Sequence, residues 1–123
     1  MIRVPKGYVR RVCMANEKDE PIADVTLRTR VDTLETLPVD IPYVVLDDVW
    51  VAQGYRGRGL STIVLKAAQD VAKSEGWAIA CRPQSHDNGP SQAQLVKLYR
   101  RLGWTQKVRS YPLWLLWRPS LDS

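Results

Sequence analysis

Apolar and polar residues alternate along the first part of the chain, which is the pattern of half-buried β-strands. Residues 22–31 show it most clearly, because polar side chains stand between Ala23, Val25, Leu27 and Thr29. One face of such a strand packs on a core while the other faces solvent. Residues 8–14 form a similar stretch, and the polar segment 16–21 between the two has the composition of a turn. We therefore expect an antiparallel hairpin, followed after a proline-containing loop by a third strand at 43–52.

The apolar spacing changes to a helical period after the third strand. Residues 60–74 carry apolar side chains at intervals of three and four, namely Leu60, Ile63, Val64, Ala67, Ala68, Val71 and Ala72. Gly76 is the expected end of this helix. A second helix is expected at 91–102, where Ser91 starts it and Gly103 closes it. One face of this helix collects Leu95, Leu98, Tyr99 and Leu102.

Short strands complete the pattern at 77–82, 104–109 and 112–117, with a loop at 83–91. The expected order of elements is βββαβαββ, an α/β arrangement of the α+β kind in which helices flank a central sheet. No repeat, low-complexity segment or linker divides the chain, so residues 1–123 are expected to form a single domain. A chain of this length is long enough to bury a core of its own.

Composition narrows the function classes. No apolar run approaches the roughly 20 residues that span a bilayer, and the N-terminus lacks the apolar core of a signal peptide, so no membrane association is expected. Cys13 and Cys81 lie far apart without a CxxC pair, and His86 is the only histidine. No metal site is therefore expected, both cysteines are interpreted as small buried hydrophobes, and a reducing cytoplasm is the default location. The formal net charge of +5 suits an anionic ligand, either a small molecule or nucleic acid.

A glycine-rich turn lies between the third strand and the first helix, Gln53-Gly54-Tyr55-Arg56-Gly57-Arg58-Gly59. The first N–H groups of a helix lack partners within the helix, and the helix dipole adds about half a positive charge at that end. Glycines let a phosphate approach the backbone, and Arg56 and Arg58 add full charges. We interpret the turn as a diphosphate site, and the alternative is a plain strand–helix connection with solvated arginines. The glycine spacing fits neither a Walker A loop nor a Rossmann fingerprint.

The segment from Val49 to Ser61 resembles the acetyl-CoA motif of the GNAT acetyltransferase superfamily. The core of the family motif is [Q/R]-x-x-G-x-[G/A], and residues 56–61 read RGRGLS, so Ser61 stands where the family has Gly or Ala. Residues 98–104, LYRRLGW, look like the family sequence LYeklGF at the end of its last helix. The two motifs occur in the family order with a strand between them, and the resemblance covers roughly residues 43–110.

The resemblance implies a mixed, strongly curved sheet in which the strands carrying residues 49–52 and 78–81 run parallel and splay apart at one end. The pantetheine arm of acetyl-CoA, the implied cosubstrate, would lie between them, bonded to the backbone of Val49 and Val51. The pyrophosphate would lie on the amides of Arg56, Gly57, Arg58, Gly59, Leu60 and Ser61. Gln92 stands where many relatives have an asparagine that contacts pantetheine or orders water, and it is longer than that residue.

The resemblance also implies direct transfer of the acetyl group to an amine, without an acyl-enzyme. Tyr99 aligns with the family tyrosine that lies near the CoA sulfur and acts as general acid; the alternative is an aromatic core residue. Asp47 and Asp48 stand where the family often has a general base. Neighbouring strand residues point to opposite faces, so alternation groups Asp48 with Trp50 and Asp47 with Val49, and only one carboxylate can face the cleft. The alternative for both is a hydrogen-bonding or solvated role.

The chain departs from the family pattern at its start, because the strand and two helices that usually precede the hairpin have no counterpart. The acceptor groove is then open to a large acceptor, such as a protein tail or nucleic acid, or is completed by a partner subunit. The apolar strand at 112–117 favours a homodimer that covers it, and packing on the chain's own helices is the alternative. His86 and Asp87 either line the acceptor site or are solvated. The residues do not identify the amine acceptor.

Two further functions stay open. One is a GNAT-fold module that binds CoA or an acidic partner without chemistry, which the shortened start and Ser61 favour. The other is nucleic-acid binding, for which the hairpin supplies the positive charges of Arg10, Arg11, Arg28 and Arg30. No helix-turn-helix, zinc-finger or aromatic RNA-binding pattern accompanies these arginines, so a solvated basic face is the default interpretation.

Overall fold

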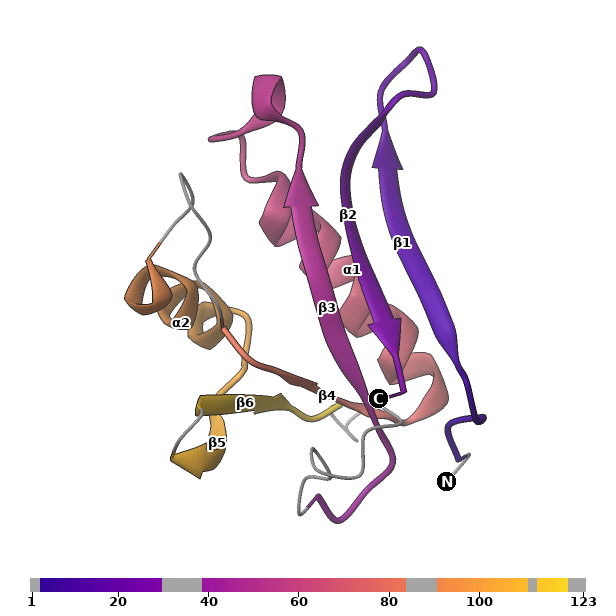
Figure 1. Ribbon diagram of the computed structural model, residues 1–123, viewed down its shortest axis with the longest axis vertical. Helices are drawn as coiled ribbons and strands as arrows, with labels where there is room; N and C mark the ends of the chain where they lie inside the picture. The colour runs from indigo at the N-terminus through magenta and orange to yellow at the C-terminus, as the bar shows by residue number, and fades with distance from the viewer. Residues whose placement is uncertain (1–2, 30–38, 84–90, 111–112, 120–123) are drawn as a thin grey trace.

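A computed structural model of the chain describes residues 3–29, 39–83, 91–110 and 113–119 (Figure 1). The elements follow one another in the order β1 (Val9–Ala15), β2 (Pro21–Arg28), β3 (Tyr43–Val51), η2 (Gln53–Tyr55), α1 (Leu60–Glu75), β4 (Ala78–Cys81), α2 (Gln92–Arg101), β5 (Gln106–Ser110) and β6 (Leu113–Trp117). The predicted order of strands and helices is confirmed, and the 3-10 helix η2 is an addition to it.

The strands form one sheet in the order β1-β2-β3-β4-β6-β5. β3 and β4 run parallel, and the other neighbouring strands run antiparallel. The parallel pairing is short, since it joins only Tyr43–Val45 to the first three residues of β4. Beyond it β3 continues beside β2, while β4 continues beside β6, and in Figure 1 the two arms run in different directions. The predicted splay of two parallel strands is therefore confirmed.

A bulge in β3 decides which side chains face which side of the sheet. Thr26 of β2 pairs with Asp47, but Asp24 pairs with Trp50, so a step of two residues on β2 spans three on β3. The extra residue shifts the alternation of side chains by one position. Asp47 therefore shares a face with Trp50, whereas Val49 packs against the core cluster on the other face. The alternation that grouped Asp47 with Val49 was wrong because it assumed an uninterrupted strand.

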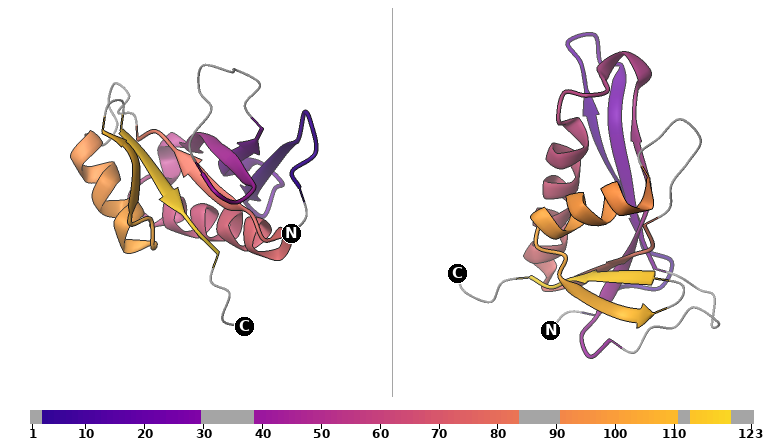
Figure 2. Two further views of the ribbon diagram at one scale, coloured as in Figure 1. Left: turned by 90° about the horizontal axis from the view of Figure 1, so that it is seen from below. Right: turned by 90° about the vertical axis from the view of Figure 1, so that its left-hand side faces the viewer.

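The main core lies between the sheet and the two helices. α1 packs across β1, β2 and β3, and its buried residues are Val64, Leu65, Ala68 and Ala72. Ile63, predicted on the buried face, is 50% exposed, and Leu65 takes its place in the core. The predicted apolar face of α2 is confirmed, since Tyr99 is buried and Leu95, Leu98 and Leu102 pack against the same cluster. In the left-hand view of Figure 2, α1 lies below β1, β2 and β3, and α2 lies to the left of it.

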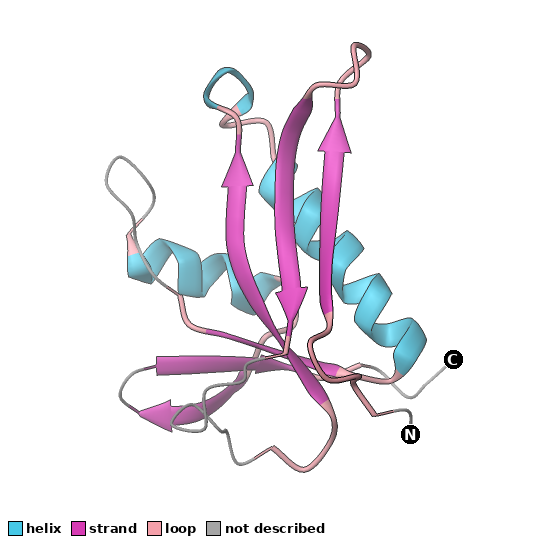
Figure 3. Cartoon of the chain, turned by 45° about the vertical axis from the view of Figure 1, so that its right-hand side comes forward, coloured by secondary structure: helices cyan, strands magenta, loops and turns pink. Residues whose placement is uncertain are grey.

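No described helix covers the opposite face of β1, β2 and β3, which we call the outer face (Figure 3). Arg11 on this face forms an ion pair with Asp24, and Arg28 forms one with Asp47 at 2.6 Å. Arg10 pairs in register with the buried Leu27 and so belongs to the other face.

The hairpin arginines therefore do not form one basic face, because two are neutralised by neighbouring carboxylates and a third lies on the opposite side of the sheet. Arg30 lies outside the described residues. Cys81 is buried as predicted, but Cys13 is exposed, because β1 is an edge strand and Cys13 points to the outer face.

The apolar strand β6 lies inside the sheet, between β4 and β5. Leu115 and Trp117 pack in the main core, while Trp114 and Leu116 join Val45, Ala78 and Ala80 in a second cluster on the other face. Residues 114–117 are thus buried by the chain itself. Their apolar character needs no second subunit to explain it, and a homodimer stays a prediction. Within the described ranges, no helix has both the length and the apolar character needed to cross a bilayer.

Candidate functional site

The turn between β3 and α1 is built around two glycines in the left-handed region. Gly57 has φ +81° and Gly59 has φ +75°, values that other residues adopt only at a cost. A Cβ atom added at either position would meet no atom within 4 Å. The glycines are therefore required by the direction of the backbone, and the space above the turn is open.

The two helices differ at their N-termini. Gly59 caps α1 and offers no side-chain hydrogen bond, and the first turn of α1 holds no acidic residue. At α2, as predicted, Ser91 is the cap: its Oγ accepts from Gln94 N at 3.2 Å, and Gln94 Oε1 accepts from Ser91 N at 2.8 Å. This capping box satisfies the backbone N–H groups of Ser91 and Gln94 with side chains of the same segment. At α1 the cap residue Gly59 has no side chain that could do the same, so this helix end lacks such a cap.

Arg56 and Arg58 add positive charge to this turn, and both are exposed. Arg56 Nε donates to the carbonyl oxygen of Val51 at 3.3 Å. The Arg58 guanidinium lies over the ring of Tyr55, 5.2 Å from its centroid. Leu60 and Ser61 are the first two residues of α1 and are half-buried. The residues of the predicted phosphate turn therefore come together at one anion-attracting helix end.

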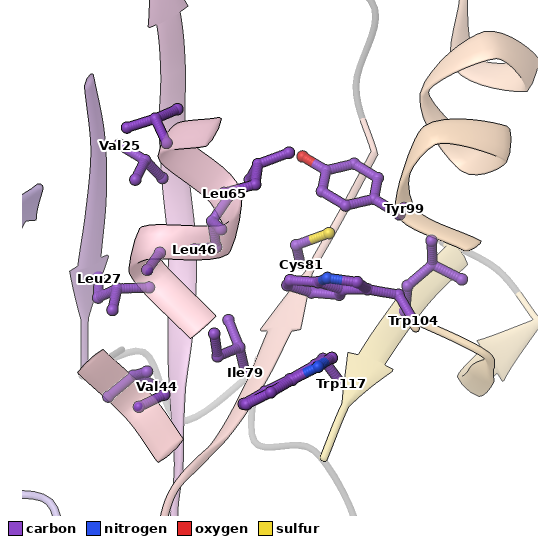
Figure 4. Packing of buried hydrophobic residues seen from close by; sticks show 14 of the residues in the cluster. Val25, Leu27, Val44, Leu46, Leu65, Ile79, Cys81, Tyr99, Trp104 and Trp117 are labelled. Carbon is purple, nitrogen blue, oxygen red and sulfur yellow. The ribbon is translucent and has the colours of Figure 1, made fainter. Parts of the chain in front are cut away.

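Tyr99 lies where the two arms of the sheet separate. Figure 4 shows its ring projecting from α2 towards Leu65 of α1, with the sulfur of Cys81 beside it. Cys81 is the first residue of β4 beyond the parallel pairing with β3. Tyr99 is only 5% exposed, and its ring packs on Trp104 with the ring centroids 5.0 Å apart.

Burial in this position controls the protonation of both groups. It raises the pKa of Tyr99 well above its usual value, and the neighbouring Cys81 adds to the increase. Burial likewise raises the pKa of the Cys81 thiol. Tyr99 therefore keeps its proton throughout the neutral and moderately alkaline range, and the buried thiol is not a reactive thiolate.

The LYRRLGW segment also has a structural role. Gly103, at φ +95°, turns the chain at the end of α2, and Trp104 N donates to Tyr99 O at 3.0 Å. The buried Trp104 donates from Nε1 to Gln69 Oε1 at 2.9 Å, and Gln69 Nε2 donates to Leu102 O at 3.3 Å. Gln69 of α1 thereby ties the segment that carries Tyr99 to the first helix. Sequence reasoning missed Gln69 and also missed the position of Cys81 beside Tyr99, because nothing local marks either contact.

The remaining predicted site residues are distributed differently. The Asp47 carboxylate lies on the outer face, paired with Arg28, and so on the opposite side of the sheet from Tyr99. The backbone of Asp48 belongs to β3, but its side chain lies outside the described part of the structure. Gln92 Nε2 donates to Pro83 O at 3.0 Å, which joins the start of α2 to the end of β4.

His86 and Asp87 lie outside the described residues. In the described ranges no group of three or more His, Cys, Asp or Glu side chains is arranged to hold a metal ion.

Comparisons with solved structures show which proteins share this fold. The anti-CRISPR protein AcrVA5 superimposes with a TM-score of 0.63 at 15% identity, over 89% of this chain and 97% of that one. The ribosomal-protein-S18-alanine N-acetyltransferase of Escherichia coli gives 0.64 at 14% identity, over 94% and 72%. The GNAT family N-acetyltransferase YhbS of Escherichia coli, solved with CoA, gives 0.61 at 18% identity. That match covers 89% of this chain but 58% of YhbS, so the chain spans less than two thirds of that relative.

Structural similarity at sequence identities this low shows only a shared fold, whereas the family is shown by the sequence itself. No curated protein matches the chain. The profile of the acetyltransferase (GNAT) family, however, matches residues 5–104, which include the glycine turn, Tyr99 and Trp104. The chain therefore belongs to the GNAT acetyltransferase family.

Proposed function

We propose that this chain is an acetyl-CoA-dependent N-acetyltransferase that moves an acetyl group to an amine by direct attack. The observation that carries the proposal is the helix end at Gly59, which combines left-handed glycines, two exposed arginines and N–H groups without a side-chain cap. Family membership and the CoA complex of the related YhbS support the choice of ligand. Acetyl-CoA supplies the acetyl group as an activated thioester.

The residues of the turn fit a diphosphate. A phosphate oxygen accepts hydrogen bonds from backbone N–H groups at a helix N-terminus, where the helix dipole is positive. The open space above Gly57 and Gly59 leaves room for it. Arg56 and Arg58 can then neutralise charge from the side of the turn. α2, whose N-terminus is closed by Ser91 and Gln94, offers no comparable position.

The splayed strands fit an amide-containing arm. Beyond Val45, the edge of β3 that faces β4 has no ladder partner on β4. Backbone groups on such an edge pair readily with an extended chain that carries amides. Val49 and Val51 stand on this free stretch of β3, so their N–H and C=O groups would hold the pantetheine arm. The carbonyl of Val51 accepts from Arg56, and this side chain would have to exchange that contact for the ligand.

Proton transfer is then divided between two sides of the sheet. Tyr99 keeps its proton at neutral pH and lies at the divergence of β3 and β4, so it can protonate the departing thiolate. The attacking amine must lose a proton to a base, and Asp47 or Asp48 on β3 would serve, directly or through water. Asp47 faces the side opposite Tyr99, which places acid and base on either side of the gap between the strands.

Calorimetric titration with acetyl-CoA tests the binding half of the proposal. We expect the wild type to bind, and Arg56→Ala and Gly59→Glu to lose at least tenfold in affinity, about 1.4 kcal/mol. Arg101→Ala is the matched control, because it removes an exposed arginine at the far end of α2. A wild type that binds no acetyl-CoA at about 1 mM would sink the proposal. Binding without turnover in a screen of amines would leave a CoA-binding module.

A further inference from the structure

The turn of the β1–β2 hairpin contacts the glycine-rich turn between β3 and α1. β2 is antiparallel to both of its neighbours, so the start of β2 lies beside the end of β3. Ala52 N donates to Ile22 O at 2.8 Å and closes this end of the ladder. Figure 1 shows the β1–β2 turn and η2 at the same end of the molecule.

Asn16 is held rigidly in the hairpin turn. Its Oδ1 accepts from Lys18 N at 2.9 Å and from Glu20 N at 3.0 Å, and its own N–H donates to Glu20 O at 3.0 Å. Because Oδ1 accepts both of these backbone N–H groups, Nδ2 points away from them. Nδ2 donates to Glu20 Oε1 and to the hydroxyl of Tyr55, both at 3.2 Å.

Tyr55 contacts both Asn16 and Arg58. It is the last residue of η2 and is half-buried, with its hydroxyl held by Asn16 at one end. The guanidinium of Arg58 lies over the ring at 5.2 Å from the centroid, which is within the range of a cation–π contact. A long exposed side chain on a glycine-rich turn would otherwise sample many rotamers.

We infer that Asn16 and Tyr55 are positioning residues that hold Arg58 ready for a phosphate group of CoA. The inference rests on the proposed function and assigns the hairpin turn a part in cosubstrate affinity. Ordering Arg58 before the ligand arrives removes part of the entropy that binding would lose. Neither Asn16 nor Tyr55 needs to touch the ligand for this effect, since Arg58 carries the charge.

A double-mutant cycle with CoA as the titrant tests the inference. Tyr55→Leu removes the ring under Arg58, and we expect it to lower CoA affinity about five- to tenfold. Tyr55→Phe removes only the hydroxyl that bonds to Asn16, and we expect it to lower CoA affinity about two- to threefold. In an Arg58→Ala background both substitutions should have no further effect. A role in folding alone would lower affinity equally in both backgrounds, so the coupling to Arg58 separates positioning from stability.

Two further variants control for the hairpin turn. Asn16→Ala should weaken CoA binding as Tyr55→Phe does, while Glu20→Ala removes the other Nδ2 contact and should leave the affinity unchanged. Wild-type binding together with unchanged affinity in Tyr55→Leu would overturn the inference and leave the proposed function standing. A wild type that binds no CoA would overturn both.

Discussion

Replacing Gly59 by alanine separates backbone strain from ligand contact, because the same helix carries a matched glycine at its other end. Gly59 caps α1 with φ +75° and ψ +16°, and Gly76 ends it with φ +77° and ψ +23°. An added Cβ meets nothing within 4 Å at either position. The strain of a left-handed alanine should therefore be the same in both variants.

The magnitude follows from this geometry. A left-handed L-residue costs about 1–2 kcal/mol, so both Gly59→Ala and Gly76→Ala should lower the free energy of unfolding by that amount. For a domain of this size, 1 kcal/mol corresponds to a fall in Tm of about 3–6 °C. Only Gly59→Ala puts a methyl group into the space above the turn between β3 and α1, where the phosphate is proposed to bind. Loss of one charge-assisted hydrogen bond, about 1.5–3 kcal/mol, would weaken CoA binding roughly ten- to hundredfold.

Two measurements on each variant are enough. Urea unfolding gives the stability loss, which should agree between the variants within the error of the method, and calorimetric titration with CoA gives the affinity. The expected result is equal destabilisation with a selective loss of binding in Gly59→Ala. Equal CoA affinity in the two alanine variants would refute the assignment of the turn as a phosphate site, and unequal destabilisation would refute the reasoning from φ.

Three other predictions test the buried side of the site. Tyr99→Phe should lower kcat about 10²- to 10⁴-fold with little change in KM for acetyl-CoA. Tyr8→Phe is the control, because the Tyr8 ring also packs on an aromatic neighbour with the centroids 5.0 Å apart, and it should leave kcat unchanged. Equal kcat values for the two variants in steady-state assays would contradict the role of Tyr99 as an acid. Burial raises the pKa of Cys81 and Tyr99 above their ordinary values of 9.0 and 10.0. The unfolded chain therefore loses these protons first. The free energy of unfolding should fall by about 1.4 kcal/mol per pH unit for each group, above about pH 9 for Cys81 and above about pH 10 for Tyr99. In urea unfolding, Cys81→Ala should make the decline of the unfolding free energy between pH 9 and 10 shallower. An unchanged decline would contradict the assignment of this pH dependence to Cys81. Gln69→Leu leaves the indole N–H of buried Trp104 without its partner. In urea unfolding, this variant should lose about 1–3 kcal/mol of unfolding free energy. A smaller loss would mean that the hydrogen bonds of Gln69 contribute little to stability.

Several features could be predicted from the sequence because they depend on a few neighbouring residues. The strand–turn–helix order follows from the change of apolar period near residue 59. Gly57 and Gly59 were expected in the turn before the first helix and Gly76 at its end, and the structure has all three at positive φ. The capping role of Ser91 was likewise predictable, because its partner Gln94 is three residues away.

The faces of the elements were less predictable, because they depend on register. The bulge in β3 exists only relative to its pairing with β2, and it moved Asp47 to the outer face. The choice of Leu65 over Ile63 for the core is similar, since α1 is rotated by the sheet on which it packs. Periodicity identifies an apolar face to within about one position, and packing decides the remainder.

The sequence by itself therefore determined the order of the elements, the glycine turn and the family, since each depends on contiguous residues. Only the tertiary structure decided which distant groups meet. Asn16 and Tyr55 are 39 positions apart, and Gln69 and Trp104 are 35 apart. The first contact forms because β1, β2 and β3 pair side by side, and the second because α1 and the segment after α2 pack around the same core. That pairing is selected by burial summed over the whole sheet, and no local pattern in the chain specifies it.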